Sequence, residues 1–207
     1  MRNTQPFISA TRRVFCLGDS LTEGVVPATN GTTFFPYSLQ LQKSLRELVG
    51  LESIQVQTLT FRRLPLATLR TSLRSTLNRM SKTCKPLLLT LIGIQDVMEG
   101  ADYNTIVQSI IDIHQDAHQR GIQTIAIGLP TSELQGKFFE FRATVEQVNR
   151  ELILWASYNH MVAFVPFPIS QYCNKILARD GFHFTEEGYR LIGARLAPIV
   201  HESLSRR

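Results

Sequence analysis

Residues 14–24 are VFCLGDSLTEG, an apolar run that passes directly into a polar turn. Val14 to Leu17 predicts a β-strand, and Gly18 permits a tight turn at its end because glycine carries no Cβ. Beyond this turn, short apolar or β-branched runs alternate with longer segments in which apolar residues recur every three or four positions. This alternation of strand and helix indicates an α/β fold.

The same patterns predict five strands and five long helices. We expect strands over 14–17, 54–59, 87–92, 124–127 and 161–165, and helices over 35–49, 66–80, 103–120, 137–158 and 185–204. Such an order implies parallel strands, right-handed crossovers and helices on both faces of the sheet. We expect one domain over residues 1–207, with 1–12 as a flexible N-terminal segment. Active sites in such sheets lie beyond the carboxyl ends of the strands.

Composition excludes several classes of protein. The chain has 207 residues, of which 43% are hydrophobic and 19% charged, as in ordinary globular proteins. Its net charge of +5 indicates a solvated basic surface rather than a nucleic-acid partner. No apolar run is long enough for an integral membrane segment.

Cysteine usage bears on the compartment. Cys16, Cys84 and Cys173 contain no C-x-x-C pair, which argues against a disulfide framework or a zinc site. Sparse, unpaired cysteines suit a reducing, cytoplasmic location. The basic, acid-free stretch up to Arg13 leaves organelle targeting as the alternative. Cys16 lies in an apolar run, and we expect it in the core.

Two short segments at opposite ends of the chain carry candidate chemistry. Ser20 follows the first predicted strand, where its hydroxyl would face the crevice and its amide could donate to a substrate oxygen. Asp180 precedes His183 by three residues, so its carboxylate could accept from Nδ1 and leave Nε2 free to take the serine proton. The alternatives are that the serine segment caps a helix, and that Asp180 caps a turn beside a core histidine.

Together these segments resemble the GDSL, or SGNH-hydrolase, family of esterases and lipases. Residues 18–24, GDSLTEG, are similar to the first block of that family, and residues 180–189, DGFHFTEEGY, to its last block. The resemblance implies a three-layer α/β/α sandwich with about five parallel strands, of flavodoxin-like architecture. It also implies that Ser20 is the nucleophile, His183 the general base and Asp180 its orienting partner. The implied reaction is hydrolysis of a small carboxylic ester (short-chain, O-acetyl or lysolipid) through an acyl-enzyme, without cofactor or metal.

The segments expected to form the oxyanion hole depart from the family pattern. The family uses the nucleophile amide, a glycine amide after the second strand and an asparagine after the third. Here Gln95 stands at the asparagine position, and residues 60–65, TFRRLP, contain no glycine. We expect the amides of Ser20 and Arg63, or of Arg62, to donate together with the Gln95 side chain. The two arginines could instead attract an anionic substrate or face solvent.

These departures keep two alternative functions open. One is a catalytically impaired relative that binds ligands, and the other is an acyltransferase that uses the same triad. The expected partner is a small-molecule ester, and the oligomeric state is not predicted. His114 and His118 share a helix face but lack a third ligand, so we interpret them as a solvated polar face. The aromatic residues at 138, 139 and 141 either line an acyl pocket or begin a helix that packs on the sheet.

Overall fold

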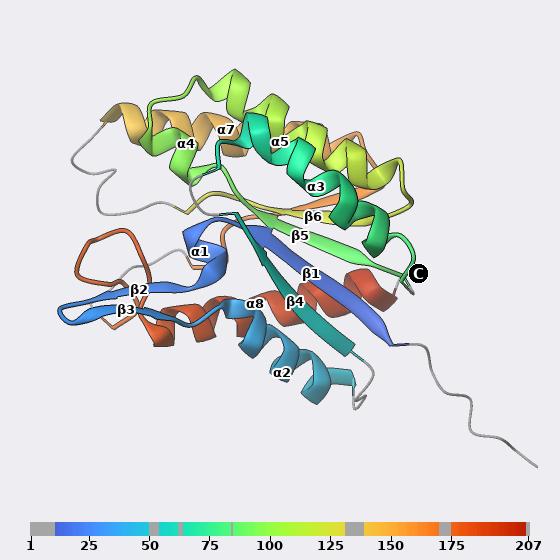
Figure 1. Ribbon diagram of the computed structural model, residues 1–207, viewed down its shortest axis with the longest axis horizontal. Helices are drawn as coiled ribbons and strands as arrows, with labels where there is room; N and C mark the ends of the chain where they lie inside the picture. Colours follow the sequence, from blue (N-terminus) through green and yellow to red (C-terminus); the bar gives the residue numbers. More distant parts are fainter. Residues whose placement is uncertain are drawn as a thin grey trace, which may run out of the picture.

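The computed structural model describes residues 11–49, 54–61, 64–83, 85–130, 139–169 and 175–205. Its centre is a five-stranded sheet, shown in Figure 1, formed by β1 Arg12–Gly18, β4 Ile54–Thr60, β5 Leu87–Leu91, β6 Gln123–Ile127 and β7 Val162–Val165. The strand order is β4-β1-β5-β6-β7, and every neighbouring pair is parallel. The predicted parallel α/β sheet is therefore confirmed.

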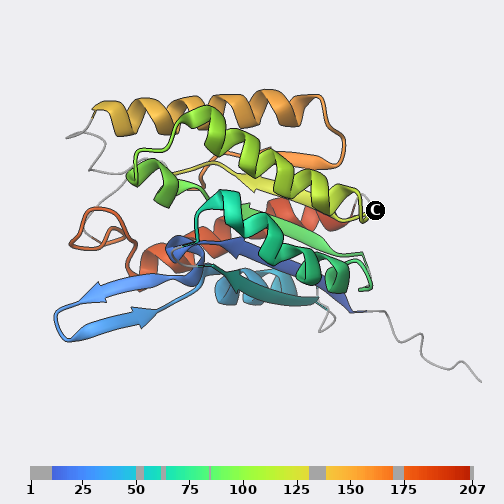
Figure 2. The same cartoon turned by 45° about the horizontal axis from the view of Figure 1, so that its top comes forward.

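Helices cover both faces of the sheet. One face carries α2 Tyr37–Val49 and α8 Glu186–Ser205, and the other carries α3 Leu66–Met80, α5 Tyr103–His118 and α7 Phe139–Ser157 (Figures 1 and 2). The residues of β5 are buried throughout, as expected for a central strand covered on both sides. The three layers confirm the predicted sandwich. Among the helices described, none is long and apolar enough to cross a membrane.

The predicted helices and strands are present, with small differences at their ends. Helix α2 begins at Tyr37 rather than Phe35. Proline disfavours the helical conformation in the residue before it, so Pro36 excludes Phe35 from the helix. Phe35 instead donates its amide to the Gly24 carbonyl oxygen at 2.7 Å. The expected start of the fourth long helix, at residues 137 and 138, lies outside the described residues.

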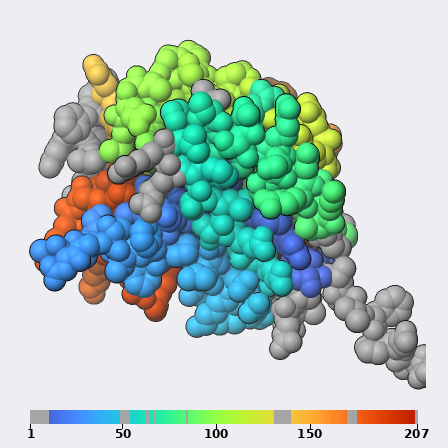
Figure 3. Space-filling view, in the orientation of Figure 1, coloured from blue at the N-terminus to red at the C-terminus, as the bar shows by residue number. Residues whose placement is uncertain are grey.

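A β-hairpin between the first strand and α2 was not expected from sequence. It consists of β2 Val25–Ala28 and β3 Gly31–Phe34, which pair antiparallel. Most of its residues are exposed, so no alternation of apolar and polar residues marks it. Its base is held because Tyr189 Oη donates to the Val25 carbonyl oxygen at 2.9 Å. The hairpin projects from one side of the molecule (Figure 3).

The interpretation of His114 as a solvated residue is wrong. Its side chain is fully buried, with Nε2 2.9 Å from Thr90 Oγ1 and Nδ1 2.7 Å from Thr124 Oγ1. His118 is half-buried, and its Nε2 lies 2.9 Å from the same Thr124 hydroxyl. Burial lowers the pKa of His114 to about 3, so the ring is neutral. The partners come from β5 and β6, which the spacing of residues within one helix cannot reveal.

Cys16 lies in the core, as expected. It is fully buried in β1, and burial raises the pKa of its thiol to about 12. Such a thiol is inert rather than nucleophilic. Cys84 and Cys173 lie outside the described residues.

Candidate active site

The predicted site residues gather beyond the carboxyl ends of β1 and β5, where the order of the strands reverses. Ser20 begins the short helix α1 Ser20–Glu23 beyond β1, and Gln95 lies in the short helix α4 Ile94–Met98 beyond β5. After β1 the chain forms β4 along one edge of β1, and it then forms β5 along the opposite edge. The connections that follow β1 and β5 therefore diverge, which leaves a crevice at the carboxyl ends of these strands. Figure 1 shows α4 on one side of α1 and the segment that precedes α8 on the other.

Close packing requires the glycine before Ser20. A Cβ at Gly18 would lie 2.0 Å from Thr22 Oγ1 and 2.3 Å from the Leu91 carbonyl oxygen, which no side chain allows. The turn can therefore close directly at the end of β1. Asp19 caps α1, because its Oδ1 accepts from the Leu21 amide at 3.1 Å. The capping alternative thus holds for Asp19, whereas the Ser20 hydroxyl faces an imidazole.

Ser20, His183 and Asp180 form one continuous hydrogen-bonded chain. His183 Nε2 lies 3.1 Å from Ser20 Oγ, and His183 Nδ1 lies 2.6 Å from Asp180 Oδ2. The other carboxylate oxygen, Oδ1, accepts from the amides of Phe182 at 3.0 Å and His183 at 2.9 Å. The structure therefore brings together three residues that lie far apart in the sequence.

The surroundings of Asp180 keep it ionised. Burial by itself would raise its pKa, but hydrogen bonds from the His183 side chain and from the amides of Phe182 and His183 outweigh that effect. The pKa of Asp180 is therefore below its usual range. An ionised carboxylate at Nδ1 holds the proton on that nitrogen, which leaves Nε2 free to accept a proton from Ser20.

A second carboxyl group lies beside the serine and is buried. Asp19 is 6% exposed, and its Oδ2 has no hydrogen-bond partner among the described residues. Burial raises the pKa of Asp19 to about 7; the Leu21 amide opposes the shift and the nearby Asp96 adds to it. Burial therefore favours the neutral, protonated form of this carboxyl group beside Ser20.

Two of the three expected oxyanion donors, Ser20 and Gln95, lie among the described residues. The Ser20 amide donates to no acceptor within the described part of the chain. Gln95 Nε2 donates to Glu99 Oε1 at 2.8 Å. An amide nitrogen carries two hydrogens, so one remains for a substrate oxygen. Arg62 and Arg63 lie outside the described residues, and the third donor stays a prediction.

A cavity of about 460 Å³ opens over the serine. Besides Ser20, Gln95 and His183, it is lined by Val25, Ile94, Met98, Glu99 and Phe182. These five residues were not predicted. Met98 and Glu99 follow Gln95 by three and four residues, and residues at this spacing share one face of a helix. The sequence could therefore have indicated that these two residues line the same cavity as Gln95. The hairpin residue Val25 had no such signal.

The aromatic residues near the start of α7 are only partly described. Phe141 packs against the hydrophobic core and also lines a second cavity beside α4. Both expectations for this residue, packing and a pocket wall, are therefore compatible with its position. Phe138 and the side chain of Phe139 lie outside the described residues.

The chain is similar to known proteins in sequence pattern and in fold. The sequence profile of the GDSL-like Lipase/Acylhydrolase family matches residues 16–191. Comparison with curated protein sequences gives no significant match. Similar solved structures include TesA (18% identity, TM-score 0.73, 91% of this chain and 97% of that chain). Others are a lipase/acylhydrolase from Enterococcus faecalis (16%, 0.73, 93% and 96%) and Est24, a carbohydrate acetylesterase from Sinorhizobium meliloti (16%, 0.65, 93% and 99%). At these identities the likeness is one of fold.

Proposed function

The chain belongs to the GDSL-like lipase/acylhydrolase family, whose members are serine hydrolases of ester bonds. We propose that it hydrolyses carboxylic esters through an acyl-enzyme on Ser20. His183 is the general base in this proposal, and Asp180 orients it. The observation that carries the proposal is the hydrogen-bonded chain from Asp180 Oδ2 to His183 Nδ1 (2.6 Å) and from His183 Nε2 to Ser20 Oγ (3.1 Å). This is the arrangement that activates a serine hydroxyl.

The first step forms the acyl-enzyme. Ser20 Oγ bonds to the ester carbonyl carbon while its proton passes to His183 Nε2, and the imidazolium formed is stabilised by the ionised Asp180. The tetrahedral intermediate then collapses, and its carbon–oxygen bond to the alcohol breaks. The leaving oxygen takes the proton from His183 Nε2, so the alcohol departs neutral.

The second step releases the acid. A water molecule gives a proton to His183 Nε2 as its oxygen attacks the acyl carbon, and the bond to Ser20 Oγ breaks when that proton returns to the serine. No metal or cofactor takes part in either step. The same base serves both halves because Nε2 is neutral again once the alcohol has left.

The oxyanion is held in this proposal by the Ser20 amide, the Gln95 side chain and a backbone amide near Arg63. Gln95 is one methylene longer than asparagine, and its contact with Glu99 limits the freedom that this extra bond adds. One donor of this kind contributes roughly 3 kcal/mol to transition-state stabilisation, so its alignment decides whether the enzyme is fast or slow.

The proposed substrate is a small ester, either short-chain, O-acetylated or a lysolipid. The cavity of about 460 Å³ over Ser20 lies within the range that holds small-molecule ligands. Among similar solved structures, one is described as a carbohydrate acetylesterase and another as a lipase/acylhydrolase, so the likeness favours no single ester class. A cytoplasmic location stays a prediction from cysteine usage.

Covalent labelling tests the proposal directly. The purified chain is treated with a fluorophosphonate, the adduct is mapped by mass spectrometry, and p-nitrophenyl esters are assayed alongside. Ser20→Ala should lose both labelling and turnover, whereas Ser72→Ala, at an exposed serine of α3, should keep both. A folded wild-type chain with neither adduct nor turnover would instead favour a ligand-binding protein. If an added alcohol diverts most of the acyl group into a new ester, the acyltransferase alternative replaces hydrolysis.

A further inference from the structure

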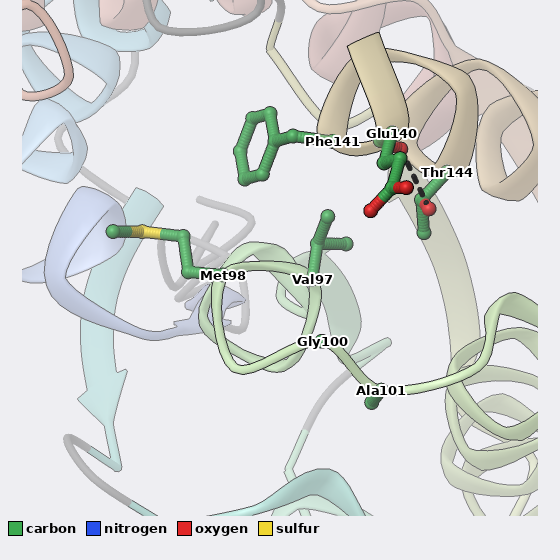
Figure 4. Close-up of a pocket in the computed structure, with 7 residues that line it drawn as sticks. All are labelled: Val97, Met98, Gly100, Ala101, Glu140, Phe141 and Thr144. Atoms are coloured by element: carbon green, nitrogen blue, oxygen red, sulfur yellow. Dashed lines mark hydrogen bonds between the residues drawn. The ribbon is translucent and has the colours of Figure 1, made fainter. Parts of the chain in front are cut away.

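Helix α4, which carries Gln95, lies between two cavities. The cavity over Ser20 borders one side of it, and a second cavity of about 440 Å³ lies between α4 and α7 (Figure 4). The second cavity is lined by apolar side chains and a glycine at α4, and by Glu140, Phe141 and Thr144 on α7. Helix α4 has only five residues, and its N-cap Gly93 provides no side-chain hydrogen bond. Besides the buried side chains of Ile94 and Val97, contacts outside the helix are therefore needed to fix its orientation.

Asp96 ties α4 to the beginning of α3. Its Oδ1 accepts from the Leu66 amide at 3.2 Å, and its carbonyl oxygen accepts from the Ala101 amide at 2.9 Å. Leu66 is the first residue of α3, and the N-cap residue Pro65 makes no side-chain cap. Because the first amides of a helix have no partner within it, Asp96 satisfies one of them from another helix. Leu66 is itself only 3% exposed, so the contact joins α4 to a buried part of the fold.

Asp96 also lies beside the turn that carries the nucleophile. Asp19, Gln95 and Asp96 line one small cavity, whose other described lining residues are apolar or glycine. The volume of this cavity is only about 10 Å³, so the three residues lie close to one another. Burial is the main cause of the raised pKa of Asp19, and the nearby charge of Asp96 adds to it. The position of Asp96 therefore bears on both the nucleophile turn and the helix that carries Gln95.

We propose that Asp96 is a positioning residue: by accepting the Leu66 amide, it holds α4 so that the free amide hydrogen of Gln95 points toward the nucleophile. This inference rests on the proposed function and adds a residue to it. Asp96 is not among the described residues that line the cavity over Ser20, so it acts through Gln95 rather than on the substrate. A donor that moves away from the oxyanion loses transition-state stabilisation, and the loss should appear in kcat rather than in KM.

Single substitutions test the contact with Leu66. Asp96→Ala removes the acceptor and should lower kcat about tenfold or more at nearly constant KM, measured with the p-nitrophenyl ester that the wild type hydrolyses fastest. Asp96→Asn keeps an oxygen that can accept the amide, so it should restore most of the lost activity. Asp102→Ala is the matched control, because Asp102 Oδ2 accepts from the Thr105 amide at 3.2 Å at the start of α5. This variant also loses a carboxylate that caps a helix, and its kcat should be unchanged.

A double variant distinguishes positioning from a general loss of structure. Gln95→Ala alone should lower kcat about 100-fold, because it removes one oxyanion donor. If Asp96 acts through Gln95, adding Asp96→Ala to this variant should lower kcat by less than about twofold further. If the two residues act independently, the two losses multiply.

Several results would overturn the inference and leave ester hydrolysis standing. These are a wild-type kcat in Asp96→Ala or in Gln95→Ala, a loss that Asp96→Asn does not recover, and losses that multiply in the double variant. If Asp96→Ala does not fold, Asp96→Glu replaces it, since its carboxylate lies one methylene further out and should lower kcat while Asp96→Asn does not. A folded wild-type chain with neither ester turnover nor a fluorophosphonate adduct on Ser20 would refute the proposed function itself.

Discussion

Replacing Asp19 by asparagine will change how the stability of the chain depends on pH. Asp19 is 6% exposed beside the nucleophile, and burial raises its pKa from 3.8 to about 7. Its Oδ1 accepts from the Leu21 amide, a contact that the asparagine oxygen can keep. The substitution therefore removes the ionisable group and retains the helix cap.

The magnitude follows from the difference between the two pKa values. From about pH 4 to about pH 7 the unfolded chain releases the Asp19 proton while the folded chain holds it. The free energy of unfolding therefore falls as pH rises through this window, by about 4 kcal/mol for a shift of this size. Asparagine cannot ionise, so the variant should gain about 4 kcal/mol over the wild type between about pH 4 and about pH 8.

Urea unfolding, followed by the fluorescence of the single tryptophan, Trp155, would measure this difference. At each pH, the free energy of unfolding of the wild type is subtracted from that of the variant. An effect of the new amide that does not depend on pH changes this difference equally at every pH. Only the pH dependence of the difference therefore reports on the Asp19 proton. Other groups with altered pKa values, including His114, titrate in both proteins and cancel. Parallel stability curves for the two proteins would refute the reasoning, since they would mean that the Asp19 proton is not retained on folding.

The remaining predictions concern the site and the buried histidine. Asp180→Asn should lower kcat on the order of 10⁴-fold, because an amide cannot stabilise the imidazolium of His183 as the carboxylate does. The circular dichroism spectrum should be unchanged. A wild-type kcat in this variant would contradict the role assigned to Asp180. Glu99→Ala should lower kcat about tenfold at constant KM, since Gln95 loses its 2.8 Å acceptor, whereas Glu99→Gln restores the rate; equal rates for both variants would show that the contact is irrelevant to the oxyanion. His114 binds its proton only near pH 3 when folded and near 6.5 when unfolded, so stability should be lost as pH falls below about 6.5, by about 3 kcal/mol at about pH 4.5. His114→Gln should flatten this loss in urea titrations, and an unaltered slope would exclude the histidine as its source.

Features that depend on neighbours in sequence were predictable. The strands and helices follow from apolar periodicity, because a residue and its third or fourth neighbour share a helix face. The close approach of Asp180 to His183 follows in the same way, since three residues of a turn bring the two side chains together. Ser20 was placed at the end of β1 because the apolar run stops at Gly18, although the reason for this glycine is crowding by Thr22 and Leu91 rather than a special backbone angle.

The sequence alone thus determined the α/β class, the order of the five central strands and five long helices, and the set Ser20, His183 and Asp180. Only the tertiary structure decided the hairpin at Val25, the burial of His114 between two strands, the contact between Gln95 and Glu99, and the contact between Asp96 and Leu66. The physical reason is that burial and cavity walls are made by segments distant in the chain. The packing of these segments depends on which helices cover which strands. The pattern of residues within one segment does not indicate which other segment will pack against it.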